Sequence, residues 1–193
     1  MLILASESKT RKALLAGAGL AFEARASEVN EREIEATAMM NGATPELVAQ
    51  ELAEAKAMAV AGDVVVGADQ VLALEGGLLH KTGDLESARA QLDRLRGKRH
   101  ELHAAVALAV KGRVVWSTVE TAELTMHDFT DAERDRVLAL EGEAVLGSVG
   151  AYRIEGPSIR LFERIEGDYF TILGLPLLPL LTALRTHAPE VFS

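Results

Sequence analysis

The sequence VVVGADQVL (residues 64–72) decides how the rest of the chain is read. Its apolar, β-branched run lies between turn signals at 62–63 and 75–77, which predicts a buried strand. Asp69 and Gln70 fall inside this stretch, where an unpaired polar group costs roughly 1–3 kcal/mol and an unpaired charge costs more. Asp69 therefore either has a partner in a functional site or marks the end of the strand and caps a turn.

A second feature is the turn that follows the short apolar strand at the N-terminus. Free backbone N–H groups and the positive end of a helix dipole suit an anion there, although Ser6 and Ser8 are also ordinary helix caps. Lys9, Arg11 and Lys12 crowd the first turn of the helix, where cations oppose the dipole. This local conflict favours a bound polyanion over simple capping.

Length and composition bound the class of protein. The 193 residues suffice for one domain with a sizeable core, and the lack of Cys excludes a disulfide framework and a thiolate zinc site. Nothing at the N-terminus resembles a signal peptide, and the apolar stretch 172–184 contains prolines and is too short to span a bilayer of about 30 Å. We therefore expect a soluble cytoplasmic protein without a membrane partner.

The charge of the chain bears on its ligands. A net charge of −9 argues against binding to nucleic acid, which requires a basic face. A small phosphorylated ligand needs only a local cluster of Lys and Arg, so the net charge does not exclude binding to such a ligand.

The pattern of elements predicts an α/β fold with a mixed parallel and antiparallel sheet rather than a regular doubly wound one. A long β-hairpin is expected over 101–124, and a capping box at 130–133 begins a helix. The remaining expected helices are at about 9–17, 44–61, 85–95 and 174–185, and the remaining strands are at 2–5, 22–26, 77–81, 147–154 and 161–165. The segment from Glu31 is expected to be an irregular polar stretch, and Arg99 and His100 are expected at the surface.

Three parts of the sequence together resemble one family. LILASESKTRKALL (2–15), VGADQV (66–71) with Lys81, and GAYRIEG (150–156) with IEGDY (165–169) and GLP (174–176) are similar to the Maf-like nucleotide pyrophosphatases. The motifs occur in order and with suitable spacing over nearly the whole chain. The resemblance implies one domain over 1–193, with a mixed sheet flanked by helices and a cleft between two lobes.

The resemblance implies hydrolysis of a nucleoside triphosphate to a monophosphate and pyrophosphate, with a divalent cation (Mg²⁺, or else Mn²⁺ or Co²⁺). Hydroxyls and a guanidinium can hold phosphate oxygens, and lysines can neutralise a leaving pyrophosphate. By role, the matching residues are Ser6, Ser8 and Arg11 for phosphate, Lys56 and Lys81 as catalytic cations, Asp69 as proton acceptor, and Glu31 with Asp69 for the metal. Without the family, Lys56 and Lys81 would be interpreted as ordinary solvated cations.

Three positions of this family bear on the choice of base. Gln70 and Glu155 resemble the subgroup that hydrolyses 7-methyl-GTP, since a carboxylate can accept from two parallel N–H donors of a guanine edge. Thr10 matches neither the aromatic residue of that subgroup nor the arginine of the subgroup that prefers pyrimidines. Taken together, the resemblance implies an enzyme that clears modified or non-canonical nucleotides such as 7-methyl-GTP.

Two alternatives remain open at the level of the sequence. One is a dTTP and UTP pyrophosphatase. The other is a nucleotide-sensing regulator of cell division that turns its ligand over slowly and acts through a partner. A homodimer is compatible with either.

Overall fold

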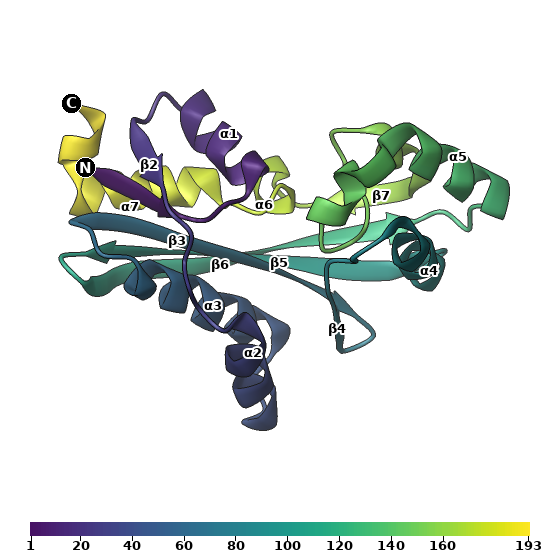
Figure 1. The fold of residues 1–193 in the computed structure, drawn as a ribbon, viewed down its shortest axis with the longest axis horizontal. Helices are drawn as coiled ribbons and strands as arrows, with labels where there is room; N and C mark the ends of the chain where they lie inside the picture. The colour runs from purple at the N-terminus through teal and green to yellow at the C-terminus, as the bar shows by residue number, and fades with distance from the viewer. The chain divides into compact units, whose positions relative to one another are not determined.

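The computed structural model describes residues 1–193 and contains a sheet of seven strands in the order β2-β1-β3-β5-β6-β7, with β4 paired to β3 (Figure 1). In chain order the elements are β1 (Leu2–Ala5), α1 (Lys9–Gly17), β2 (Phe22–Ala24), α2 (Glu31–Met40), α3 (Pro45–Ala59), β3 (Val64–Leu74), β4 (Gly77–Leu79), α4 (Leu85–Leu95), β5 (Arg99–Val110), β6 (Arg113–Met126), α5 (Asp131–Glu141), β7 (Phe162–Glu166), α6 (Tyr169–Ile172) and α7 (Leu177–His187). Three 3₁₀ helices are η1 (Gly142–Gly147), η2 (Pro157–Leu161) and η3 (Pro189–Phe192).

The predicted mixed sheet is confirmed. Strand β1 pairs in parallel with β2 and β3, whereas β3 pairs with β4 and β6 with β7 in antiparallel fashion. All four residues of β1 and ten of the eleven of β3 are buried, which explains why both strands read as apolar runs rather than as alternating patterns. No helix combines the length and hydropathy that a bilayer span requires.

The chain divides into two compact units. Unit 1 comprises residues 1–70, 103–121 and 168–193, and unit 2 comprises 71–102 and 122–167. The long strands β3, β5 and β6 each contribute residues to both units.

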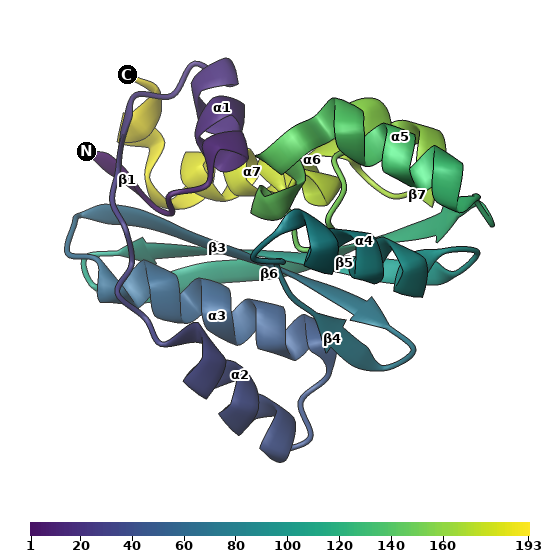
Figure 2. The same cartoon turned by 45° about the vertical axis from the view of Figure 1, so that its right-hand side comes forward.

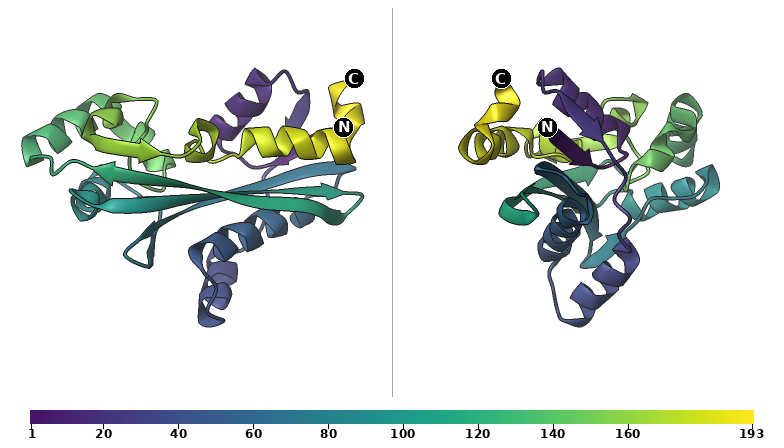
Figure 3. Two further views of the ribbon diagram at one scale, coloured as in Figure 1. Left: turned by 180° about the vertical axis from the view of Figure 1, so that it is seen from behind. Right: turned by 60° about the vertical axis from the view of Figure 1, so that its left-hand side comes forward.

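The hydrophobic core of unit 1 joins its strands to the C-terminal helix. Leu4 and Val66, on adjacent strands, belong to the same cluster as Leu180 and Leu184 of α7. Helices α1 and α7 lie on one side of β3, and α3 lies on the other (Figures 2 and 3). Helix α2 packs against α3. Both chain termini belong to unit 1.

The predicted hairpin is formed by β5 and β6. Its two-residue turn, Lys111-Gly112, has φ angles of 50° and 74°. Positive φ at both central residues is the geometry that matches the twist of the flanking strands.

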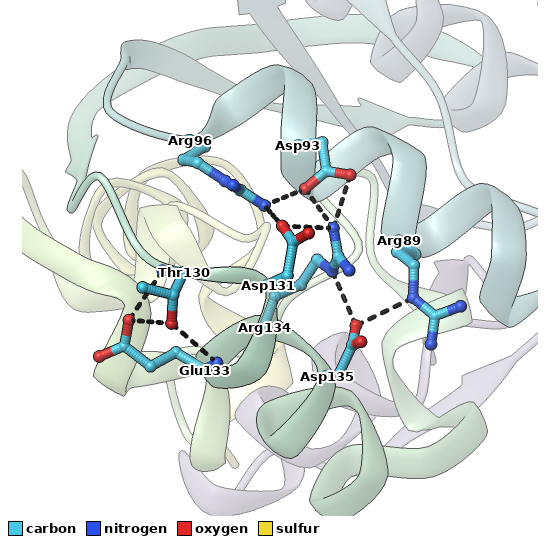
Figure 4. Close-up of polar contacts among 8 residues, drawn as sticks. All are labelled: Arg89, Asp93, Arg96, Thr130, Asp131, Glu133, Arg134 and Asp135. Carbon is cyan, nitrogen blue, oxygen red and sulfur yellow. Dashed lines mark hydrogen bonds and ion pairs between the residues drawn. The ribbon is translucent and has the colours of Figure 1, made fainter.

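In unit 2, charged side chains join α4 to α5 (Figure 4). Arg134 Nη1 lies 2.6 and 2.7 Å from the two carboxylate oxygens of Asp93, and Asp135 bridges Arg134 to Arg89. The predicted capping box is also present, since Thr130 and Glu133 exchange backbone and side-chain bonds. These contacts hold the start of α5 against α4.

One alternative is decided and two expectations about local structure were wrong. Asp69 lies in the middle of β3, which excludes the alternative in which it marks the end of the strand and caps a turn. The polar stretch after Asn30 forms α2, because Asn30 accepts a bond from the Glu33 N–H and so caps a run of helix-forming residues. The segment 147–154 is not a strand but consists of turns, with the Tyr152 side chain buried.

His100 is also placed differently from the expectation. It is 1% exposed, its Nε2 lies 2.9 Å from the Tyr152 hydroxyl, and its ring lies beside those of Tyr152 and Phe162. Burial lowers the pKa of His100 to about 4.

This burial predicts a loss of stability in mild acid. The unfolded chain protonates His100 below about pH 6.5 but the folded chain only near pH 4, so stability should fall by up to about 3 kcal/mol between these values and then level off. Urea unfolding of the wild type and of His100→Phe at several pH values between these limits measures this loss of stability. Parallel pH profiles for the two proteins would refute the assignment.

Candidate active site

The centre of the candidate site is the side chain of Lys56, which contacts two carboxylates within unit 1. Its Nζ donates to Asp69 Oδ1 in a short bond and lies 2.7 Å from Glu31 Oε1. The side chains of Lys56 and Asp69 are 8% and 10% exposed, whereas that of Glu31 is 54% exposed. The structure thus brings together three of the predicted residues, Lys56, Asp69 and Glu31. The Lys56 ammonium is buried where it contacts Asp69 and lies nearer to solvent where it contacts Glu31.

A close approach of α3 to β3 creates this pairing. A Cβ atom added at Gly67 would lie 2.1 Å from the Ala53 carbonyl oxygen and 2.4 Å from the Ala57 nitrogen. Only glycine allows the helix backbone to lie against the strand at that point. As a result, Lys56, on the adjacent turn of α3, reaches Asp69 two residues further along β3.

Arg11 joins three segments of unit 1. Its Nε donates to the Gly174 carbonyl at 2.7 Å, and its Nη1 donates to the Ala68 carbonyl at 2.9 Å and to Ser6 Oγ at 3.3 Å. Burial lowers the pKa of Arg11, and the negative charges of Asp69 and Glu31 partly offset that effect. The remaining nitrogen, Nη2, is the part of the guanidinium left for a ligand.

The hydroxyls of the N-terminal turn serve the turn itself. Ser8 Oγ accepts from the Arg11 N–H at 3.3 Å and caps α1, and Ser6 Oγ accepts from the Ser8 N–H at 3.2 Å. The capping role is therefore confirmed, and phosphate binding by these serines stays a prediction. Thr10 is half-buried in the first turn of α1.

Gln70 holds the segment that follows β7. Its amide nitrogen donates to the carbonyls of Thr171 and Ile172 at 3.1 and 3.0 Å, at the end of the one-turn helix α6. Both donors are thereby used, and only its oxygen is left to interact with a ligand. Arg11 and Gln70 both secure this segment, at Gly174 and α6 respectively.

We expect the loss of these two bonds to weaken the fold of unit 1. Gln70→Leu leaves the Ile172 carbonyl without a donor, whereas the Thr171 carbonyl keeps the Gly174 N–H, and it should lower the free energy of unfolding by about 1–3 kcal/mol. Gln70→Glu, which keeps the size but cannot donate twice, should act in the same direction. Urea unfolding tests both, and an unchanged midpoint in the two variants would show that water replaces the amide.

The two other predicted residues belong to unit 2. Lys81 follows β4 and is exposed, in a loop that lines an open pocket of about 420 Å³ together with residues of α4. Glu155 lies in the turn before η2, where its Oε1 accepts from Arg153 Nε at 3.2 Å. Sequence reasoning did not single out Arg153 or its second partner, Glu141.

The side chains around Lys56 include two carboxylates that could hold a divalent cation. Glu31 and Asp69 converge on one point, and no cluster of three or more metal-ligating side chains is present. Mg²⁺ is commonly held by one or two carboxylates, with substrate phosphates and water completing its shell. The two carboxylates therefore fit a cation that binds with a phosphorylated substrate rather than in a protein cage.

Asp69, paired with Lys56, and Arg11, which binds the carbonyl of the neighbouring Ala68, thus lie in one part of unit 1. The chain belongs to the Maf-like protein family, whose profile matches residues 1–187. This membership confirms the resemblance on which the assignment of site residues rested.

Relatives with curated names cover almost the full chain. A protein of Brucella abortus named 7-methyl-GTP pyrophosphatase is 50% identical over 188 residues, which is 95% of this chain and 94% of the relative. A protein of the same name from Rhizobium meliloti is 51% identical over 96% of this chain and 95% of its own length. A protein of Caulobacter vibrioides named nucleoside triphosphate pyrophosphatase is 48% identical over 95% of this chain and 94% of its own length.

Proposed function

We propose that this protein hydrolyses nucleoside triphosphates to the monophosphate and pyrophosphate. The observation that carries the proposal is the buried contact between Lys56 and Asp69, because it holds a carboxylate in place where a water molecule can lose its proton. The names of the relatives support the same reaction.

In the proposed mechanism, Asp69 acts as the general base. Lys56 binds Oδ1 and orients the carboxylate, which leaves Oδ2 to accept a proton from water. Arg11 would bind phosphate oxygens through Nη2, and Lys56 and Lys81 would neutralise negative charge on the departing pyrophosphate. Ser6 and Ser8 would shape the turn that receives the phosphates.

A divalent cation would be held by Glu31 and Asp69. When bound, it would polarise the phosphate oxygens and offset their charge. Lys56 already lies between these carboxylates, so the cation and the ammonium would share them. We propose Mg²⁺, with Mn²⁺ or Co²⁺ as substitutes.

For the base, we propose 7-methylguanine. Glu155 can accept from two N–H donors on the guanine edge, whereas an amide at this position suits the mixed edge of uracil or thymine. Two of the relatives carry this substrate in their names. Thr10 would offer no aromatic surface for stacking, so the base would depend on Glu155 and on the oxygen of Gln70. We place this activity in the cytoplasm, where it would remove modified nucleotides.

The experiment is pyrophosphate release from 7-methyl-GTP, GTP, UTP and dTTP with Mg²⁺, Mn²⁺, Co²⁺ or excess EDTA. We expect the highest kcat/KM for 7-methyl-GTP and no turnover in EDTA. The highest value for UTP and dTTP would favour a pyrimidine enzyme instead. Tight binding without turnover under any condition would favour a nucleotide sensor.

A further inference from the structure

Glu141 is an unusual residue for its position. It is the last residue of α5, where the helix dipole disfavours a negative charge, and its side chain is only 1% exposed. Its Oε1 accepts from the Ser158 N–H at 2.9 Å and from the Ser158 hydroxyl at 2.7 Å. A buried carboxylate placed against a helix dipole requires such bonds, and these anchor it to the loop that follows Tyr152.

The second oxygen of Glu141 reaches the same loop from the other side. Arg153 Nη1 lies 3.3 Å from Glu141 Oε2, while Arg153 Nε donates to Glu155 Oε1 at 3.2 Å. The guanidinium thus bridges two carboxylates, one buried and one, Glu155, 29% exposed. Glu141 binds residues on both sides of Glu155 and fixes the backbone that presents it.

The glycine after Glu155 shows how closely this loop lies on Glu141. A Cβ atom at Gly156 would stand 2.5 Å from Glu141 Oε1 and 3.0 Å from Oε2. A larger residue would displace either the carboxylate or the loop. The position of Glu155 is therefore defined by the buried carboxylate beneath it.

The charges in this group do not cancel. Arg153 and Glu155 alone form a neutral pair, and Glu141 adds one negative charge that water and salt screen poorly because it is buried. Methylation at N7 gives guanine a formal positive charge, which unmethylated guanine lacks. A net negative charge behind Glu155 therefore distinguishes the two bases, even though both present the same N1–H and N2–H donors to that carboxylate.

We propose that Glu141 is a positioning residue for specificity, which orients Glu155 through Arg153 and makes the enzyme prefer cationic, N7-methylated bases. This inference rests on the proposed role of Glu155 in contacting the base. It adds the selection between a methylated and an unmethylated guanine, which Glu155 alone does not explain.

The test is the ratio of kcat/KM for 7-methyl-GTP to that for GTP, in the wild type, Glu141→Gln and Glu143→Gln. Glu143 is the matched control, because it is exposed and lies two residues away. Glu141→Gln should lower the ratio about tenfold, mainly through a higher KM for 7-methyl-GTP with kcat retained, because the buried negative charge behind Glu155 is lost. Glu143→Gln should leave the ratio within about twofold.

A purely structural role for Glu141 would lower both kcat/KM values alike and leave their ratio unchanged. If Glu141→Gln does not fold, Arg153→Lys serves in its place, because it keeps the charge but cannot bridge two carboxylates in the same way. An unchanged ratio in the folded variant, with a wild-type preference for 7-methyl-GTP, would overturn this inference alone. A wild-type ratio at or below one would overturn the proposed base as well.

Discussion

Asp69→Asn is expected to lower kcat by about 10²–10⁴ while nucleotide binding is largely retained. The amide has the shape of the carboxylate and can still accept from Lys56 through its oxygen, but it cannot accept a proton from water. Pyrophosphate release under saturating substrate measures kcat, and titration with a non-hydrolysable triphosphate analogue measures binding.

Asp63→Asn is the matched control, because Asp63 is exposed and directly precedes β3. It should behave like the wild type. Turnover at the wild-type rate in folded Asp69→Asn would remove Asp69 from the mechanism.

The second large effect concerns stability. Lys56→Met removes the cation next to Asp69 and leaves that buried carboxylate unpaired. Breaking a buried pair in this way costs about 3–5 kcal/mol. Urea unfolding at pH 7 in EDTA measures the loss without a metal ion to replace the ammonium.

The double variant Lys56→Met with Asp69→Leu distinguishes lost charge pairing from lost packing. It removes both charges, so it should recover most of the stability that Lys56→Met loses. Lys9→Met, at an exposed position, should change stability by less than about 0.5 kcal/mol. A loss below about 1 kcal/mol in Lys56→Met would mean that water reaches Asp69.

The strand that contains Asp69 could be predicted from its sequence, but the partner of Asp69 could not. Periodicity identifies α3 and β3 separately, whereas the contact between Lys56 and Asp69 depends on how closely the two pack. Gly67 was the available signal, since a glycine in a buried strand often marks a close approach of another backbone. Its significance emerges only when the helix that faces it is known.

Partners that are distant in sequence were the least predictable. Arg11 and Gln70 bind carbonyls 163 and more than 100 residues away, and carbonyls carry no sequence signal because every residue has one. The sequence motif assigns the side chain of Gln70 to the base, whereas in the structure its amide nitrogen holds α6. That helix has only four residues, too few for a periodic pattern.

Unit 2 shows a different limit. A polar residue after a glycine turn usually lies at the surface, which is why the sequence predicts an exposed His100, yet an aromatic cluster buries it. The same cluster contains Tyr152, whose burial accounts for the strand-like pattern at 147–154 that forms turns instead. Tertiary packing in this region overrides the local pattern.

The identity of the products tests the central claim most directly. Phosphorus NMR of a reaction with 7-methyl-GTP and Mg²⁺ should show equal amounts of the nucleoside monophosphate and pyrophosphate, with no diphosphate at any time. A nucleoside diphosphate with inorganic phosphate would contradict cleavage between the α and β phosphates.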